Sequence, residues 1–166
     1  ILGPLTNPAG ANNQLLGVFH HDLVGIQARV LQTLGSRHAL VVHGLDGLDE
    51  ISISGGTEVA ELKNGKVEEY TVDPTRFGVK LAQLNAIQAK NAAESKNMLL
   101  SVLDNKSGPA RDIVMLNSGA AIYVSGLADS MEQGVRKAGE AIASGAAHAK
   151  LNQLIEFSNR FKVVKA

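Results

Sequence analysis

Residues 14–44, QLLGVFHHDLVGIQARVLQTLGSRHALVVHG, decide the fold because they join two strand-like segments to one helix-like segment. Gln14–Phe19 and Ala39–Val42 are short apolar runs, which are typical of buried strands. Between them, apolar residues recur at helical spacing from Leu23 to Leu34, and Asp22 is a candidate helix cap. A strand, a helix and a strand with short connections predict a βαβ unit with two parallel strands and a right-handed crossover.

After this unit, the sequence shows signals of antiparallel structure. Residues 51–54 alternate Ile and Ser, which predicts a half-exposed strand. Two further strand-like runs, 57–62 and 66–72, flank Lys63-Asn64-Gly65, and Asn-Gly between two such runs predicts a hairpin. The α/β fold is therefore expected to have a mixed, mostly parallel central sheet flanked by helices.

The carboxy-terminal half of the chain is expected to be mainly helical. Residues 81–103 are rich in Ala, Asn, Lys and Leu, and Pro109 suits the first turn of a helix that runs to about Val124. Residues 129–132 have the spacing of a capping box, which predicts the start of another helix. The last helical stretch is expected over residues 146–161.

Composition excludes several classes of protein and site. The 166 residues are 45% hydrophobic, which is enough to bury a core, so one α/β domain over residues 1–166 is expected. Basic and acidic residues both number 16, and the resulting formal net charge of zero predicts no general attraction to nucleic acid or anionic membranes. The lack of cysteine excludes disulfides and thiolate metal sites, and no apolar run approaches membrane-spanning length.

A segment with three carboxylates is the clearest candidate site. Asp46, Asp49 and Glu50 follow the Ala39–Val42 strand, and ligands of open α/β sheets bind beyond the carboxyl ends of the strands. Mg²⁺ takes oxygen ligands, usually one or two carboxylates together with waters and a phosphate. The spacing alone leaves two interpretations open, a magnesium site and an acidic surface loop that leads into the next strand.

Two other positions are candidates for contact with a ligand. His43 ends the same strand and could act as a base or donate a hydrogen bond, although a structural histidine is the commoner interpretation. Gly3 and Pro4 lie in a loop whose shape the prolines restrict and where glycine admits close approach. On local grounds a plain connector is favoured for that loop.

The remaining polar candidates are interpreted as structural. We expect surface positions for the other histidines, which are His20, His21, His38 and His148. Asn91 and Asn117 lie in apolar helical stretches, where a buried amide usually serves packing through hydrogen bonds. The sequence has no Walker loop and no strand-preceded Gly-x-Gly-x-x-Gly, so it contains no obvious phosphate cradle of its own.

Several segments match one known family in their order and spacing. The strongest are Leu2-Gly3-Pro4-Leu5-Thr6-Asn7-Pro8-Ala9 and Asp46-Gly47-Leu48-Asp49-Glu50. The weaker ones are Val41-Val42-His43-Gly44, Lys90-Asn91-Ala92-Ala93, Gly108-Pro109-Ala110-Arg111-Asp112 and Leu116-Asn117 with Tyr123 and Gly126. Each segment is weak evidence by itself, but together, across essentially the whole chain, they resemble the anthranilate phosphoribosyltransferases.

The resemblance implies a fold and a reaction. That family pairs a small helical amino-terminal domain with a larger α/β domain. With magnesium, it transfers the 5-phosphoribosyl group from phosphoribosyl pyrophosphate to the amine of anthranilate, in tryptophan biosynthesis. By position, Asp49 and Glu50 match the acidic pair that binds Mg²⁺ on the pyrophosphate, and Gly3 and Pro4 match the loop beside anthranilate. It assigns no role to Asp46, and it implies a cytoplasmic homodimer.

The chain also departs from the family pattern. The Gly-Thr-Gly-Gly-Asp phosphate loop, the arginine before the Leu-Gly-Pro-Leu segment and the helical dimer-forming domain do not occur in residues 1–166. We therefore expect the carboxy-terminal portion of a longer two-domain enzyme. One alternative is a pyrimidine nucleoside phosphorylase of the same superfamily, against which the paired acids argue. Another is a non-catalytic nucleic-acid-binding relative, against which the zero net charge and 4% aromatic content argue.

Overall fold

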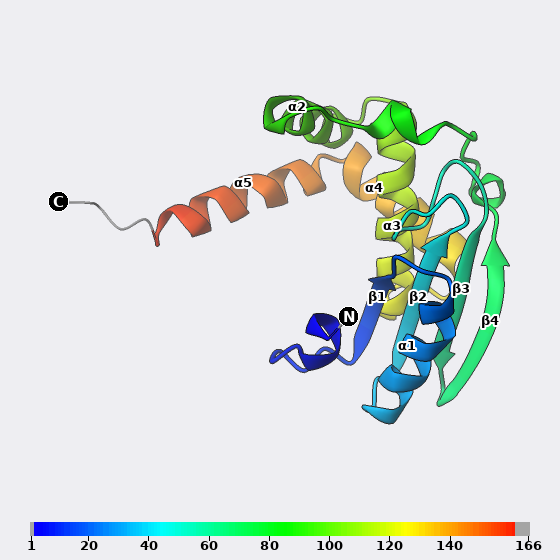
Figure 1. Cartoon of the computed structure of the whole chain (residues 1–166). Helices are drawn as coiled ribbons and strands as arrows, with labels where there is room; N and C mark the ends of the chain where they lie inside the picture. The colour runs from blue at the N-terminus through cyan, green and yellow to red at the C-terminus, as the bar shows by residue number, and fades with distance from the viewer. Residues whose placement is uncertain (1, 162–166) are drawn as a thin grey trace.

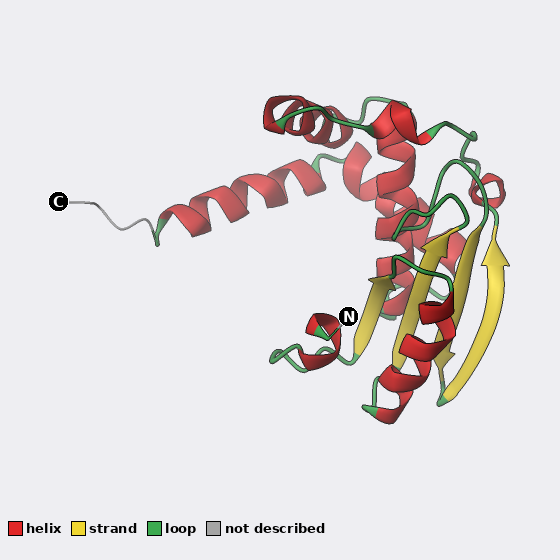
Figure 2. Ribbon diagram, viewed as in Figure 1, coloured by secondary structure: helices red, strands yellow, loops and turns green. Residues whose placement is uncertain are grey.

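A computed structural model describes residues 2–161 and shows a sheet with helices on both faces (Figures 1 and 2). In this part of the chain the α-helices and strands are β1 (Asn13–Gly17), α1 (Asp22–Thr33), β2 (His38–Gly44), β3 (Thr57–Lys63), β4 (Lys66–Val72), α2 (Ala92–Leu103), α3 (Pro109–Val124), α4 (Met131–Ala143) and α5 (Ala146–Asn159). No helix within residues 2–161 is both long and apolar enough to cross a membrane.

The sheet confirms the predicted βαβ unit and the predicted hairpin. Its strand order is β1-β2-β3-β4, with β1 parallel to β2 and both later pairings antiparallel. Asn64 and Gly65 form the hairpin turn with φ values of 52° and 72°, as an Asn-Gly turn requires. The sheet is therefore mixed, but the expected predominance of parallel strands does not hold for these four, because the hairpin adds two antiparallel pairings.

β2 is buried along its whole length because helices cover both of its faces (Figure 2). Leu40 and Val42 belong to a core that includes residues of α3 and α4, such as Leu116 and Val135. Ala39 and Val41 belong to a second core with α1. The alternation of side chains along a strand thus supplies both cores from one strand, and it fixes which polar groups can emerge at the strand's ends.

α3 and α4 pack so closely that their backbones touch. A Cβ atom on Gly134 would lie 2.1 Å from the carbonyl oxygen of Gly119, and one on Gly119 would lie 2.6 Å from the backbone nitrogen of Val135. Glycine at both positions is therefore a condition of this crossing. α5 follows α4 and runs away from the sheet with no buried residue (Figure 1).

Several local predictions are wrong. The helical stretch expected over residues 81–103 forms an α-helix only from Ala92, and the residues before it hold a short 3-10 helix, Leu84–Ile87, and irregular backbone. Residues 51–54 do not form a strand: Ile51 and Ile53 are fully buried, and the backbone N–H of Ser52 donates to Thr57 Oγ1 at 3.0 Å. Asn91 is an exposed helix cap whose side chain accepts from the backbone N–H of Glu94 at 2.9 Å, so it is not a packing group within a helix. Asp22 is the first residue of α1 and makes no capping bond.

His38 is buried, so its predicted surface position is also wrong. Its Nε2 lies 2.9 Å from Oε1 of Glu61. The same oxygen accepts a hydrogen bond from the hydroxyl of Tyr123 at 2.6 Å, and Oε2 of Glu61 accepts one from the hydroxyl of Tyr70 at 2.8 Å. Burial alone would raise the pKa of Glu61, but these hydrogen bonds hold that pKa below its ordinary value. The network ties β2, β3, β4 and α3 together, whereas His20 and His21 are exposed as predicted.

We expect Glu61→Gln to lower the free energy of unfolding by about 1–2 kcal/mol near neutral pH, because charged acceptors form the stronger hydrogen bonds. The folded-state pKa of Glu61 lies below its usual value of 4.5. Its contribution is therefore complete above that value and is lost as the pH falls through the folded-state pKa. Urea unfolding at about pH 7 and about pH 3 should show the difference between wild type and variant shrinking in acid. A constant difference, or an equal loss in the exposed control Glu68→Gln, would contradict this account.

Candidate functional site

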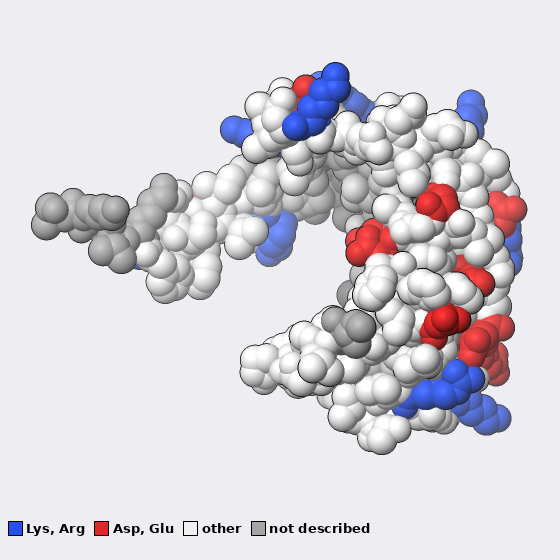
Figure 3. Space-filling model, viewed as in Figure 1, with Lys and Arg blue, Asp and Glu red and all other residues white. Residues whose placement is uncertain are grey.

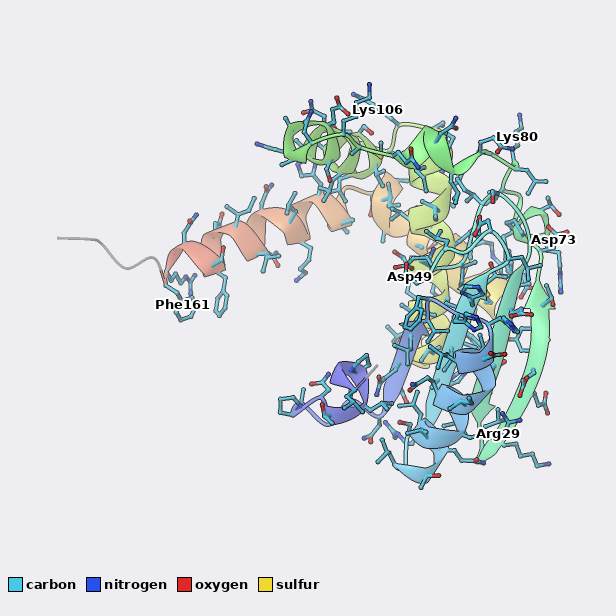
Figure 4. All side chains as sticks on the ribbon, in the orientation of Figure 1. Arg29, Asp49, Asp73, Lys80, Lys106 and Phe161 are labelled. Carbon is cyan, nitrogen blue, oxygen red and sulfur yellow. The ribbon has the colours of Figure 1, made fainter. Side chains whose placement is uncertain are left out.

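The acidic segment lies in the loop between β2 and β3, residues 45–56, at the carboxyl edge of β2. The loop starts with a tight turn, in which the N–H of Gly47 donates to the carbonyl of Gly44 at 2.8 Å. The N–H of Gly44 donates to the carbonyl of Leu48 at 2.7 Å. Asp49 and Glu50 follow and are both exposed. Figure 3 shows a hollow between the amino-terminal segment and α5, and Figure 4 shows Asp49 on the side of the sheet that faces it.

Asp46 braces this loop from within. Its carboxylate accepts hydrogen bonds from the hydroxyls of Ser52 and Ser54 and from the backbone N–H of Leu48 at 3.1 Å. Burial would raise the pKa of Asp46, but these hydrogen bonds lower it below its usual value. The structure thus explains the carboxylate to which the sequence assigned no role: its oxygens are taken up by the loop.

Asn117 of α3 fixes the other end of the acidic pair. Its Oδ1 accepts from the backbone N–H of Ile51 at 2.9 Å, and its Nδ2 donates to the carbonyl of Ile51 at 3.0 Å. The same Nδ2 also donates to the carbonyl of Ile113 at 3.0 Å. The interpretation of Asn117 as a packing group that acts through hydrogen bonds is confirmed, and its partner is the residue directly after Glu50.

The end of β1 brings the other candidate residues towards this loop. Gly17 lies against the loop so closely that a Cβ atom there would be 1.6 Å from the carbonyl oxygen of Asp49. The carbonyl of the next residue, Val18, lies 2.8 Å from Nδ1 of His43. Pro4, from the turn Gly3–Thr6, lines a cavity of about 60 Å³ together with Gly17 and Val18. Pro4, His43 and Asp49 therefore all lie next to Gly17 or Val18, at the end of β1.

His43 is buried, and its partner fixes its hydrogen-bonding roles. A carbonyl oxygen only accepts, so Nδ1 of His43 carries a hydrogen and donates a hydrogen bond to the carbonyl oxygen of Val18. In the neutral ring, Nε2 then keeps its lone pair. This contact supports the structural interpretation of His43, because it joins the ends of β1 and β2.

Electrostatics at Asp49 and Glu50 favour a cation. Desolvation and the neighbouring Asp49 carboxylate raise the pKa of Glu50 above its usual value. Among the side chains of residues 2–161, no Lys, Arg or His forms an ion pair with either acid. Two adjacent carboxylates without a basic partner form a donor set that suits Mg²⁺, which binds oxygen ligands and relieves their repulsion.

We expect Gly17→Ala to displace the acidic loop, because the new methyl group would overlap the backbone of Asp49 rather than a flexible side chain. Overpacking of this kind costs about 1–3 kcal/mol of stability, and a shift of the reacting groups by about 1 Å can cost about 10²-fold in rate. Thermal unfolding and steady-state kinetics of the full-length protein measure the two effects. Gly55→Ala, in the same loop with open space around it, is the matched control and should behave as wild type. Normal kinetics in Gly17→Ala would refute the close contact.

Comparison with known families identifies close relatives of this fold. The family model described as "Glycosyl transferase family, a/b domain" matches residues 1–148. The anthranilate phosphoribosyltransferase of Laribacter hongkongensis is 64% identical over 160 residues, which cover 96% of this chain and 47% of the relative. That of Nitrosomonas europaea is 61% identical over 160 residues, with the same coverage. The chain thus spans about half the length of the curated relatives it matches.

Solved structures agree with the sequence relatives. The anthranilate phosphoribosyltransferase of Thermus thermophilus superposes with a TM-score of 0.85 at 38% identity, covering 94% of this chain and 46% of that one. The Saccharomyces cerevisiae enzyme in complex with PRPP and Mg superposes with a TM-score of 0.83 at 27% identity, covering 94% and 45%. The same yeast enzyme in complex with 4-fluoroanthranilate gives a TM-score of 0.83 at 26% identity, covering 94% and 46%.

Proposed function

Because this chain belongs to the glycosyl transferase family, a/b domain, we propose that it forms the carboxy-terminal α/β part of an anthranilate phosphoribosyltransferase. The parent enzyme would transfer the 5-phosphoribosyl group of phosphoribosyl pyrophosphate to the amine of anthranilate, with release of pyrophosphate. The observation that carries the proposal is the exposed Asp49–Glu50 pair, fixed from both sides at the carboxyl edge of β2, in a chain 64% identical to such an enzyme.

In this proposal, Asp49 and Glu50 hold Mg²⁺ against the pyrophosphate. The pair fits the ion because its two carboxylates are adjacent, exposed and without a basic partner in the described part of the chain. Mg²⁺, when bound, neutralises the negative charge that develops on the leaving pyrophosphate. Asp46 is not proposed as a ligand, since Ser52, Ser54 and Leu48 occupy its oxygens.

Gly3 and Pro4 are proposed to form the anthranilate side of the cleft. Pro4 contributes to the cavity at Gly17 and Val18, and Gly17 contacts Asp49, so the two substrates would meet across the end of β1. We assign His43 a supporting part at most, through its bond to Val18. The amine of anthranilate is aromatic and largely unprotonated at neutral pH, so the chain needs no strong base. Positioning of the two substrates supplies much of the rate.

The partners of this chain are also proposed rather than observed. Relatives are about twice as long, which supports a cleft completed by the rest of the polypeptide, including its phosphate loop. We propose that residues 1–166 form a single α/β domain and that the parent enzyme is a cytoplasmic homodimer that assembles through its helical domain.

The test is an assay of the full-length protein that contains this chain. Phosphoribosyl pyrophosphate, anthranilate and Mg²⁺ are mixed with the protein, and phosphoribosyl anthranilate is followed by its fluorescence. Product formation that stops when EDTA is added supports the proposal. Absence of product, together with phosphate-dependent release of thymine or uracil from nucleosides, would instead indicate a nucleoside phosphorylase. Salt-sensitive retention on single-stranded DNA without either activity would indicate a nucleic-acid-binding protein.

A further inference from the structure

We infer that Asn117 is a positioning residue for the acidic pair Asp49 and Glu50. Through its two hydrogen bonds to the backbone of Ile51, Asn117 sets the affinity of the site for a divalent cation. The inference rests on the proposed function, because it concerns how that same site holds its metal. The amide of Asn117 bonds to the backbone of Ile51 and Ile113. Its influence on Asp49 and Glu50 therefore passes through the main chain.

The geometry of the contact fixes both position and orientation. The N–H of Ile51 belongs to the peptide unit that joins Glu50 to Ile51, so its 2.9 Å bond to Oδ1 of Asn117 orients that peptide plane. The 3.0 Å bond from Nδ2 to the carbonyl of Ile51 holds the next plane. The second bond from Nδ2, to Ile113, decides which end of the amide carries the nitrogen, because a carbonyl can only accept.

Ile51 itself belongs to no regular strand or helix, so no backbone ladder holds it in the absence of this contact. The ladder of β2 ends at Gly44, and β3 begins at Thr57, so Ile51 lies in an irregular stretch although it is fully buried. A buried backbone group without a partner is unfavourable, because it loses its hydrogen bonds to water and gains none in return. Asn has a low helix propensity, and the hydrogen bonds that Asn117 makes with the loop offset this disadvantage in α3.

Asn117 is held firmly in place because its neighbours in α3 are buried. Leu116 and Ala120, on either side of Asn117, are fully buried in the core that also contains Ile51. Asp46 braces the loop before the acidic pair, and Gly17 lies beneath Asp49. Asp49 and Glu50 directly precede Ile51, so release of Ile51 would free the backbone that positions their carboxylates and would weaken the site.

Asn117→Ala and Asn117→Asp test this inference in the full-length protein. The probe is Mn²⁺, titrated in the presence of phosphoribosyl pyrophosphate and in the absence of anthranilate, with free Mn²⁺ measured by electron paramagnetic resonance. We expect both variants to bind Mn²⁺ about 10-fold more weakly, as is typical for lost outer-shell support of a metal ligand. The aspartate is isosteric and keeps the acceptor for Ile51. Its added negative charge would by itself tighten cation binding, so weaker binding cannot result from charge.

Val124→Ala is the matched control, because it weakens the packing of the same helix about two turns away from Asn117. It should lower the thermal stability but keep the Mn²⁺ affinity within about twofold of wild type, as expected for a distant site. Hydrogen exchange of the Ile51 amide gives a readout that is independent of metal and activity, and Asn117→Ala, which removes the acceptor, should lose protection there. Wild-type Mn²⁺ affinity in Asn117→Ala, despite that loss, would overturn the inference alone. A wild-type protein that binds no Mn²⁺ with phosphoribosyl pyrophosphate would overturn the proposed function instead.

Discussion

The double variant Asp49→Asn, Glu50→Gln should lose about 10²–10³-fold in kcat/KM while remaining folded, because it removes both charges proposed to hold the cation on the leaving group. Both side chains are exposed, so their replacement by isosteric amides removes no buried contact. The thermal midpoint should stay level or rise slightly, since the variant removes the desolvation and the Asp49 repulsion that raise the pKa of Glu50.

A second adjacent acid pair in the chain provides the control for this experiment. Glu68 and Glu69 lie on β4, away from the acidic loop, and Glu69 forms an exposed ion pair with Arg29 at 2.8 Å. Such a pair is worth about 0–1 kcal/mol, so the variant Glu68→Gln, Glu69→Gln should keep its activity and nearly all of its stability. Fluorescence of the product measures the rates, and Mg²⁺ titration shows whether high metal restores the first variant. Equal activity of the two double variants would remove the metal role from Asp49 and Glu50.

Gly134→Ala should cause the largest loss of stability among single methyl additions in the helical half, about 1–2 kcal/mol net. Alanine favours a helix over glycine by about 1 kcal/mol, but overpacking against a backbone costs more than that gain. The new Cβ would stand 2.1 Å from the carbonyl oxygen of Gly119, so α4 must move away from α3 as a unit. Denaturant unfolding measures the loss.

Gly139→Ala, in the same helix, is the control for this prediction. Its Cβ would meet only the flexible end of Met115, with Cε at 3.2 Å, and that side chain can give way. We therefore expect Gly139→Ala to raise the free energy of unfolding by up to about 1 kcal/mol through helix propensity. If both alanines stabilise the protein, then the close crossing of α3 and α4 at Gly134 is wrong.

Local patterns predicted the parts of this fold that depend on local chemistry. The apolar spacing of α1, the Asn64-Gly65 turn and Pro109 at the start of α3 each act within a few residues, and the structure confirms all three elements. The predicted capping box over residues 129–132 is displaced by one residue. Ser130 caps α4, and its side chain accepts a hydrogen bond from the N–H of Gln133 at 3.2 Å.

Two of the failures, at residues 51–54 and at His38, involve partners that are far apart in sequence. The Ile-Ser alternation of residues 51–54 looks like a strand, but Ile51 pairs with Asn117, 66 residues away. His38 was expected at the surface because nothing near it in sequence indicates Glu61 as its partner. The assignment of Asp49 and Glu50 came from the resemblance rather than from spacing, and it stays a prediction until metal binding is measured.

The contact between Asn117 and Ile51 also bears on the order in which the protein folds. Its two residues are 66 apart in sequence, so closing it requires the whole segment between β2 and α3 to be arranged first. The strands and the hairpin rely on nearer neighbours and can form earlier. The metal site should therefore mature late, after α3 docks on the sheet, and intermediates that already contain native secondary structure should not yet bind Mn²⁺.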